Sequence, residues 1–469
     1  MTGFLSAQPW HAALAAMFVG AALALCIPHA RTSWAAALAV LGGVAVFVAD
    51  LSFRGVAPHA ADGVSIFVAP LIVALATLCA LAGGGALREL SAPAAPFAMA
   101  LALCAAGGWV FALIATDWIA FALAAELAWL AGAGFAAAAD VRRGALNGVL
   151  RMVVAGGVSA ALILVGVAFV MRASLSAEIA ALGAANNVRL CIAGLVLVLL
   201  SLAVKAGLAP LHAWAGATFG RAGSFPVMLI GAVSMSGAVA AIVRIGAAAA
   251  AAPQLATAVE AMLAALGAAS VVIGSIQAMG AANLRRLAAY AFASQAGCVL
   301  LSVSLGSPAG FAAALVQMFA LAAAMLALLA TTAVTRDGSL HALDGLGRRY
   351  PIAGIAVTAG ALSLMGAPLT VGFLGRWRLI EAAVGAGWWW VAGIALLASL
   401  AAVFYGGRLI ERVYFRHAAA VTEPNRDPWR FLIAPTLAAA TFAIALGVEP
   451  SVLLQASARA AALMFGGAP

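Results

Sequence analysis

The sequence predicts an all-α integral membrane protein of about fourteen transmembrane helices. Of its 469 residues, 66% are apolar and only 8% are charged, and the mean hydropathy is +1.14. A soluble domain carries about 25% charged residues, so this composition cannot provide a water-exposed surface. The arginines fall mostly between apolar stretches of about twenty residues, the length that crosses a bilayer.

Each apolar stretch is assigned one helix. The expected ranges are 9–27, 33–50, 64–86, 95–115, 118–139, 146–171, 188–216, 225–248, 256–279, 286–306, 309–334, 352–384, 387–410 and 431–448. The twelfth stretch is too long for one straight span and holds Gly366 and Pro368, so we expect a broken helix there. A short, fairly apolar tail follows from Pro450. The first stretch lacks a preceding basic region, which favours a retained span over a signal peptide.

Arginine placement predicts the orientation. With alternating helices, five arginines lie on one side: Arg54, Arg172, Arg189, Arg244 and Arg459. The other side receives fourteen: Arg31, Arg88, Arg142, Arg143, Arg221, Arg285, Arg286, Arg336, Arg348, Arg349, Arg412, Arg416, Arg426 and Arg430. Under the positive-inside rule that side is cytoplasmic, and both termini are periplasmic in a bacterial inner membrane. The net charge of +9 is then a topology signal, and we expect no nucleic-acid partner.

Cofactor motifs are missing from the sequence. The five cysteines (Cys26, Cys79, Cys104, Cys191 and Cys298) stand singly, without metal-site or disulfide spacing. No G-x-G-x-x-G opens a strand–helix unit, and no helix carries paired histidines for haem. We therefore expect no cofactor and no metal in this chain.

Lys205 is the only lysine in the chain, and it lies inside the apolar run of the seventh predicted helix. A charge near mid-membrane costs roughly 2.5–3.5 kcal/mol on insertion scales, so it is rarely retained without a role. A buried lysine can release its proton, whereas a guanidinium stays protonated. Lys205 is therefore a candidate proton carrier; the alternative is a lysine that reaches toward the membrane surface.

A proline follows Lys205 at position 210 and predicts a break in the same helix. Proline removes a backbone donor, which lipid tolerates only where neighbouring helices or water satisfy the freed groups. His212 lies in this break. Two interpretations stay open for it: a titrating or water-organising group, or a hydrogen-bond donor to a freed carbonyl.

The twelfth predicted helix contains a similar interruption. Ala-Pro-Leu occurs at 209–211 and again at 367–369, so Pro210 and Pro368 break two helices that lie five spans apart. Paired broken helices in two halves indicate an internal repeat with ion sites at the breaks. In the second copy the basic residue is Arg376.

Glu126 is an isolated acid in the middle of the fifth predicted helix. A carboxylate and a lysine that lie close together in a low dielectric stabilise each other's charged forms, so Glu126 is the expected partner of Lys205. The alternative is a structural carboxylate that hydroxyls or backbone groups satisfy. For Glu260 and Arg151, which lie nearer helix ends, a structural role is favoured.

These residues resemble a known family. The resemblance extends over about residues 62–415 and rests on Glu126, Lys205, Pro210, His212 and Trp214, on Asn283–Tyr290, on Gly366-Ala367-Pro368 and on Gly372–Trp377. The chain is similar to the antiporter-like subunits of respiratory complex I, of Mrp-type cation/proton antiporters and of membrane-bound hydrogenases. It looks most like the subunit N and subunit M type of complex I.

The resemblance implies a fold with broken helices 7 and 12 and with helices 4–8 and 9–13 as inverted repeats. The implied segments are 1–92, 93–250, 251–415 and 416–469. Carried over by residue, Glu126 matches the family's glutamate on helix 5 and Lys205 its lysine on helix 7. Arg376 stands where relatives have lysine or glutamate. Three family features are missing: Ser234 and Ser236 replace a helix 8 lysine, Gln295 replaces a helix 10 histidine, and helix 11 has no lysine.

The implied function is proton translocation as a membrane subunit of a redox-driven pump, of the NADH-quinone oxidoreductase or membrane-bound hydrogenase type. Its partners would be other membrane subunits, the lipid bilayer, and protons or sodium ions, with quinone, flavin and iron–sulfur clusters only in partner subunits. Two alternatives remain: an Mrp-type antiporter subunit without a redox partner, and a structural subunit that no longer conducts.

Overall fold

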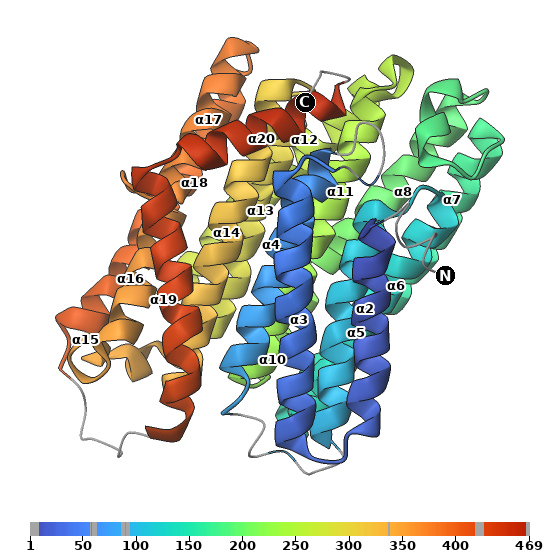
Figure 1. Cartoon of the computed structure of the whole chain (residues 1–469). Coiled ribbons are helices and arrows are strands. Elements are labelled where there is room, and N and C mark those ends of the chain that lie inside the picture. Colours follow the sequence, from blue (N-terminus) through green and yellow to red (C-terminus); the bar gives the residue numbers. More distant parts are fainter. Residues whose placement is uncertain are drawn as a thin grey trace.

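The structure is a computed structural model that describes residues 9–56, 58, 63–85, 90, 94–335, 338–417 and 426–465, without the side chains of 426–430. Every regular element in these ranges is a helix, which confirms the predicted fold class (Figure 1). In the same ranges, thirteen helices are long and apolar enough to cross a membrane. The predicted twelfth span is the broken pair α16 and α17, each 15 residues long.

The first half of the chain follows the expected order. Its helices are α2 (Pro9–Cys26), α3 (Ala30–Phe53), α4 (Gly63–Ala82), α5 (Ala94–Ile114), α6 (Trp118–Ala139), α7 (Arg143–Ser174), η2 (Ile179–Ala184), α8 (Val188–Ala206), α9 (Ala213–Phe219), α10 (Ser224–Met228), η3 (Leu229–Met235) and α11 (Ser236–Ala250). Of these, η2 is a 3₁₀ helix and η3 is a π-helix. The eighth predicted span is thus α10, η3 and α11 in sequence, and the π-helical turn was not predicted.

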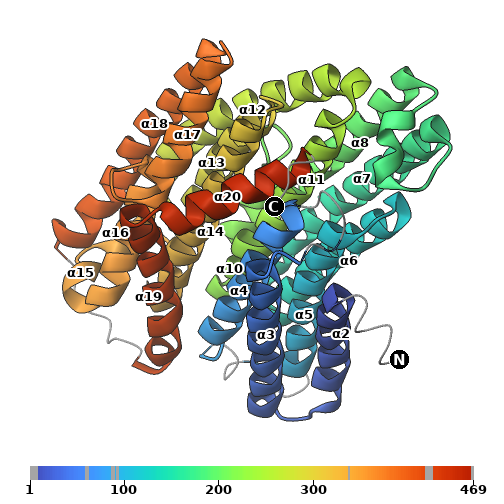
Figure 2. The ribbon, with the colours of Figure 1, turned by 45° about the horizontal axis from the view of Figure 1, so that its top comes forward.

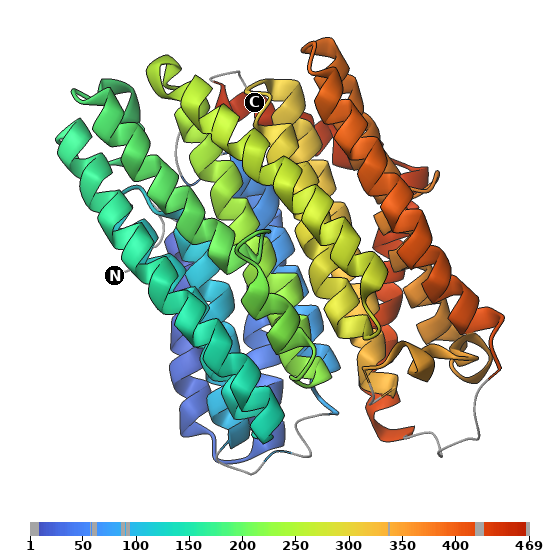
Figure 3. The same cartoon turned by 180° about the vertical axis from the view of Figure 1, so that it is seen from behind.

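The second half contains the remaining elements. They are α12 (Pro253–Gly280), α13 (Leu284–Val303), α14 (Pro308–Thr335), η4 (Leu340–Leu343), α15 (Leu346–Arg349), α16 (Pro351–Met365), α17 (Val371–Gly385), α18 (Trp389–Tyr414), α19 (Arg426–Val448) and α20 (Ser451–Met464). From behind, the long yellow-green α12 crosses the middle of the molecule between the two sets of helices (Figure 3).

Local sequence accounts for where these helices begin. Asp117, Asn187 and Asn283 accept hydrogen bonds from the first backbone N–H groups of α6, α8 and α13. Side-chain oxygens at this position satisfy donors that have no partner inside the helix. Proline begins α12 and α16, where its missing N–H costs nothing. The short polar connections between apolar runs therefore set the helix limits.

Two matching sets of contacts support an internal repeat. Arg244 of α11 donates to the carbonyls of Ala112 and Ala115 at the end of α5, at 2.9 and 2.5 Å. Arg408 of α18 likewise donates to the carbonyls of Ala278 and Ala281 at the end of α12, at 3.4 and 2.8 Å. Because α12 comes five crossings after α5, the two sets lie at opposite ends of the bundle.

The connections next to these helix ends are also duplicated. An isolated β-bridge joins Asp117 to Glu178 in the first half, and another joins Asn283 to Ser339 in the second. In each half the bridge precedes a 3₁₀ helix, η2 or η4. These paired contacts agree with the inverted repeat of helices 4–8 and 9–13. The exact limits of the four predicted segments stay a prediction.

Arginine-bearing turns gather at one end of the bundle. The α2–α3 turn, α10 and α15 lie at the lower end of Figure 1, and α20 lies at the upper end. Arg31, Arg142, Arg221 and Arg348 belong to or adjoin turns of this lower end. Arg88 and Arg336 lie outside the described residues, and the side chains of Arg426 and Arg430 are not described.

The tail predicted from Pro450 is a helix in the structure. Helix α20 has 14 residues, fewer than the ~20 that cross a bilayer, and it lies across the bundle (Figures 1 and 2). It buries one apolar side, with Leu453, Ala460 and Met464, against the other helices. An amphipathic helix of this kind suits the membrane interface.

Candidate functional site

The first helix break lies directly after Lys205. Helix α8 ends at Ala206, and Gly207 has φ of 65°, a left-handed conformation that glycine adopts at little cost. The Leu208 N–H closes the helix end by donating to the Ala203 carbonyl at 3.0 Å. The chain then passes Pro210 and resumes as α9 at Ala213. The predicted break is confirmed, and it leaves Lys205 in the last turn of a membrane helix.

Lys205 forms a buried ion pair with Glu126 of α6. The Lys205 Nζ atom is 2.8 Å from Glu126 Oε1, and the side-chain exposure is 0% for the lysine and 17% for the glutamate. The lysine therefore does not reach the membrane surface. The Glu126 side chain is partly exposed, on a helix face that also exposes Leu123 and Leu130, but its Oε1 atom is buried.

Two tryptophans hold this ion pair in place. The Trp129 ring lies 5.2 Å from Lys205 Nζ, within the range of a cation–π interaction. Trp214 packs edge-on against Trp129 with ring centroids 4.8 Å apart, and its indole N–H donates to the Val204 carbonyl at 2.7 Å. Trp214 thereby links α9, after the break, to the last turn of α8. The ammonium is enclosed by one carboxylate and one aromatic face.

His212 connects the first break to the second half of the chain. Its Nε2 atom hydrogen-bonds the Gln277 side-chain oxygen of α12, and its ring packs edge-on against Tyr290 of α13, with centroids 5.9 Å apart. His212 is buried, and its Nδ1 atom has no hydrogen-bond partner among the described residues. Of the two interpretations of His212, the bond to a freed carbonyl is not present among the described residues, where the partner is the side-chain amide of Gln277; a titrating or water-organising role stays a prediction.

Backbone groups at the break are satisfied by α12. The Ala209 N–H donates to Ser270 Oγ at 3.1 Å, and Ser270 in turn donates to the Ala293 carbonyl at 2.8 Å. One turn further along α12, Ser275 and Ser294 Oγ atoms are 2.8 Å apart. Three polar side chains of α12, those of Ser270, Ser275 and Gln277, therefore contact the break or the facing helix α13. Sequence reasoning missed them because a serine or glutamine in an apolar helix is common.

The second break has the same local form. Helix α16 ends at Met365, Gly366 has φ of 72°, and the Ala367 N–H donates to the Leu362 carbonyl at 2.9 Å. Pro368 follows, and α17 begins at Val371 with Thr370 as its N-cap. The predicted break is confirmed, and it closes with the same backbone hydrogen bond as the first.

Arg376 lies in the second break without an acidic partner. Its Nη1 atom donates to the Met365 carbonyl at 3.0 Å and to Ser399 Oγ at 2.5 Å, and its Nη2 atom donates to the Leu364 carbonyl at 3.0 Å and to Gln295 Oε1. Among the described residues no carboxylate forms an ion pair with it. The guanidinium therefore neutralises the carbonyl end of α16, where a helix dipole favours a cation.

Gln295 organises the surroundings of Arg376. Its amide N–H donates to the Leu364 carbonyl at 3.3 Å, and its oxygen also accepts from Gln317 at 3.0 Å. The sequence singled out Gln295 as a departure from the family, but it gave no reason to expect this contact. A side-chain amide suits the position because its oxygen accepts from the guanidinium while its nitrogen donates.

Ser234 and Ser236 lie in and after the π-helical turn η3. Both side chains are buried, and their hydroxyl oxygens have no hydrogen-bond partner among the described residues. A methyl group built at Gly132 of α6 would lie 3.1 Å from Ser234 Oγ, so Ser234 faces the helix that carries Glu126. Single π-turns are frequent at functional sites. Both serines are therefore inside the bundle rather than on the lipid face, and Ser234 faces α6.

The family profile described as "NADH:quinone oxidoreductase/Mrp antiporter, TM" matches residues 115–402. NADH-quinone oxidoreductase subunit N 1 of Solidesulfovibrio magneticus is 31% identical and covers 100% of both chains. F(420)H(2) dehydrogenase subunit N of Methanosarcina mazei is 29% identical, and the match covers 78% of this chain and 77% of the length of that protein.

A solved structure of respiratory complex I from Thermus thermophilus with bound aureothin contains a chain of the same fold. The TM-score is 0.80 at 26% identity, over 95% of this chain and 98% of that one. The matched region of the family profile includes both helix breaks, Glu126, Lys205 and Arg376.

Proposed function

Because the chain belongs to the NADH:quinone oxidoreductase/Mrp antiporter transmembrane family, we propose that it translocates protons as a membrane subunit of a multisubunit, redox-driven pump. The relatives named NADH-quinone oxidoreductase and F(420)H(2) dehydrogenase subunit N favour a redox complex over a free-standing antiporter. Quinone, flavin and iron–sulfur chemistry would belong to partner subunits. The chain's own contribution is to hold and move protons.

The buried Lys205–Glu126 ion pair carries this proposal. At 2.8 Å the carboxylate stabilises the ammonium in a site that excludes solvent from the lysine. When a shift of α6 or α8 separates the pair, the buried ammonium loses its compensating charge and gives up its proton at Nζ. When the pair closes again, reprotonation of the lysine is favoured. An ion pair at the end of a broken helix can thus couple a helix movement to one proton.

A succession of polar groups supports a route away from Lys205. The break at Pro210 opens toward His212, which contacts Gln277 and Tyr290, and the Ser275–Ser294 pair follows at the α12–α13 interface. The imidazole can carry a proton, and the hydroxyls can relay one. This assignment of His212 is a proposal that follows from its partners.

We assign Arg376 a different role. A guanidinium stays protonated, and here four hydrogen bonds to oxygen hold it in place. Arg376 then acts as a fixed positive charge in the second half, which repels an arriving proton until a neighbouring negative charge compensates. Translocation in this chain would depend on the first half, with the second half as an electrostatic gate.

The arginine distribution supports an orientation in a bacterial inner membrane. Because the arginine-rich turns gather at one end of the bundle, that end is proposed to face the cytoplasm and both termini the periplasm.

Isolation of the intact complex tests the proposed function. The full chain, tagged at its C-terminus, would be purified from native membranes, its partners identified by mass spectrometry, and the complex reconstituted in vesicles. We expect redox subunits to co-purify and electron transfer to drive proton movement in sodium-free buffer. Co-purification of small antiporter subunits alone, with sodium-driven proton exchange and no redox activity, would favour the Mrp-type alternative instead.

A further inference from the structure

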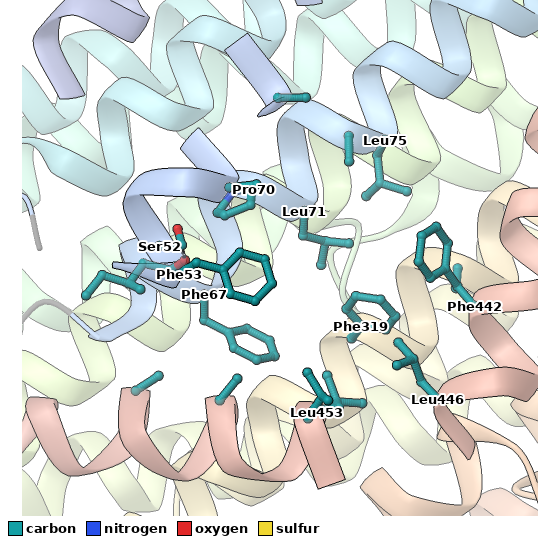
Figure 4. A pocket seen from close by; sticks show the side chains of 18 of the residues that line it. Ser52, Phe53, Phe67, Pro70, Leu71, Leu75, Phe319, Phe442, Leu446 and Leu453 are labelled. Atoms are coloured by element: carbon teal, nitrogen blue, oxygen red, sulfur yellow. Dashed lines mark hydrogen bonds between the residues drawn. The ribbon is translucent and has the colours of Figure 1, made fainter. Parts of the chain in front are cut away.

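A large apolar groove lies away from both helix breaks. Its volume is about 840 Å³, and α3, α4, α14, α19 and α20 line it. Figure 4 shows the side chains of Phe53, Phe67, Leu71, Phe319, Phe442 and Leu453 around one common space. None of Glu126, Lys205, His212 or Arg376 lines it. The groove is therefore not part of the proposed proton route.

The depth of the groove matches one leaflet of a bilayer. Along α4 its wall runs from Ile66 to Leu78, an advance of twelve residues that corresponds to about 18 Å at about 1.5 Å per residue. Half of a hydrocarbon core of ~30 Å is about 15 Å. An acyl chain that enters at one membrane face would end near the bottom of this groove.

Near the charged end of the groove, the break in the helix ladder of α4 leaves no free carbonyl group. Pro70 removes the backbone donor that would pair with the Ile66 carbonyl, but Ser52 Oγ lies 2.7 Å from that carbonyl oxygen and 2.9 Å from the Val48 carbonyl oxygen. The Ile66 carbonyl, which lacks its helical donor, can thereby be satisfied by the Ser52 hydroxyl, whereas the Val48 carbonyl belongs to the regular ladder of α3. Such a wall suits a hydrocarbon chain better than the polar head of a quinone, which needs a donor.

One end of the groove is positively charged. Arg54, which follows the end of α3, and Arg459 of α20 both line it. Arg54 pairs with Asp50 at 2.9 Å. The exposed Arg459 guanidinium, in contrast, has no hydrogen-bond or ion-pair partner among the residues that the structure describes. Helix α20 crosses the bundle at this end, so its free cation lies where lipid headgroups are expected (Figure 1).

We propose that this groove binds an anionic phospholipid, with an acyl chain against α4 and α14 and the headgroup phosphate at Arg459. The apolar depth of one leaflet and the unpaired cation at the entrance each match one part of such a molecule. A guanidinium pairs with phosphate oxygens through parallel N–H donors, so Arg459 suits an anionic headgroup. This site is independent of the proposed ion translocation.

Lipid binding to the full-length chain in detergent tests the proposal. Native mass spectrometry would compare the binding of phosphatidylglycerol, phosphatidylethanolamine and an isoprenoid quinone. The two phospholipids would carry the same acyl chains. We expect phosphatidylglycerol to bind about fivefold tighter than phosphatidylethanolamine, since one basic residue at the membrane surface contributes about 1 kcal/mol. Arg459→Gln should abolish this preference, and Arg459→Lys should retain it. Arg172→Gln, a change of an exposed arginine on α7, is the matched control.

Filling the groove tests the acyl-chain part separately. Ala74→Trp on α4 and the milder Ala323→Leu on α14 both place bulk in the groove, whereas Ala161→Trp places it on an exposed face of α7. We expect the first two to reduce retention of both phospholipids and the third to leave it unchanged. The proposal is overturned if groove filling has no effect, if both phospholipids bind equally to the wild type, or if the quinone displaces phosphatidylglycerol at equal concentration.

Discussion

Glu126→Gln removes the charge that compensates Lys205 and keeps nearly the same side-chain volume. At 2.8 Å and an effective dielectric constant of about 20, the attraction between the two unit charges is about 6 kcal/mol. Part of this energy offsets the cost of removing both groups from water. Breaking one partner of a buried pair costs about 3–5 kcal/mol, because the remaining charge is left uncompensated.

That energy changes the protonation of Lys205 by a large factor. A charged ammonium without its partner is disfavoured by an energy of this order, so the lysine does not readily regain its proton when α6 and α8 return to their positions. A lysine that stays neutral throughout the cycle cannot accept a proton, so pumping should fall at least about tenfold. Glu126→Asp shortens the reach of the carboxylate without removing its charge, and it should retain part of the activity.

The assay measures proton movement per electron transferred by the reconstituted complex, with Glu126→Gln, Lys205→Ala and the double variant in parallel. Because both residues act as one unit, the double variant should be little worse than either single variant. The matched control is Glu381→Gln, which breaks an exposed ion pair with Arg378 at 3.0 Å. An exposed pair contributes about 0–1 kcal/mol, so this variant should pump normally. Normal pumping by Glu126→Gln, or additive effects of the two single changes, would refute the pairing.

Three further predictions concern other parts of the structure. Arg376→Lys keeps the charge, but a lysine has no planar group that can bond the Leu364 and Met365 carbonyls together. The free energy of unfolding of the purified chain should therefore fall by about 1.5–3 kcal/mol, measured as a lower thermal unfolding temperature. Unchanged stability would contradict the described contacts. A cysteine at the exposed His341 should react with a membrane-impermeant reagent only from the cytoplasm and one at Leu175 only from the periplasm, and the reverse pattern would invert the proposed orientation. At Asp140, burial opposes ionisation, but hydrogen bonds from Arg142 and from the Gly223 N–H lower the pKa of the carboxyl below its ordinary value. The ionised carboxylate therefore stabilises the fold above about pH 4, and this stabilisation is lost as the pH falls below that value. Asp140→Asn should flatten this part of a stability profile between pH 3 and 7, and an unchanged profile would contradict the assignment.

Much of the fold was predictable because lipid restricts the choices. Backbone groups in the bilayer must be paired, so long apolar runs are helices, and a proline within such a run indicates a break. Both breaks and the Lys205–Glu126 contact follow from this argument, since a buried lysine requires a partner. Charged residues and prolines cost free energy inside a membrane helix, so their presence in an apolar run is a clear signal in the sequence.

The features that the sequence did not predict involve residues that cost little free energy in a membrane helix, or geometry that depends on packing. Nothing in 229–235 distinguishes a π-helix from an α-helix, because the difference is one hydrogen-bond register. Ser270 and Gln277 cost little in a membrane helix, so their contacts with the break gave no signal. The orientation of α20 depends on a length too short to span and on the packing of its apolar side, which only the assembled helices define.

Lys205→Arg tests the central claim most directly, because it retains a positive charge next to Glu126 while preventing release of the proton. The measurement is the number of protons moved per electron in vesicles that contain the complete complex, with electron transfer recorded in the same sample. The account predicts that the variant assembles but moves fewer protons per electron than the wild type. An unchanged ratio would show that Lys205 is only a fixed charge, and the proposed role of the ion pair would be wrong.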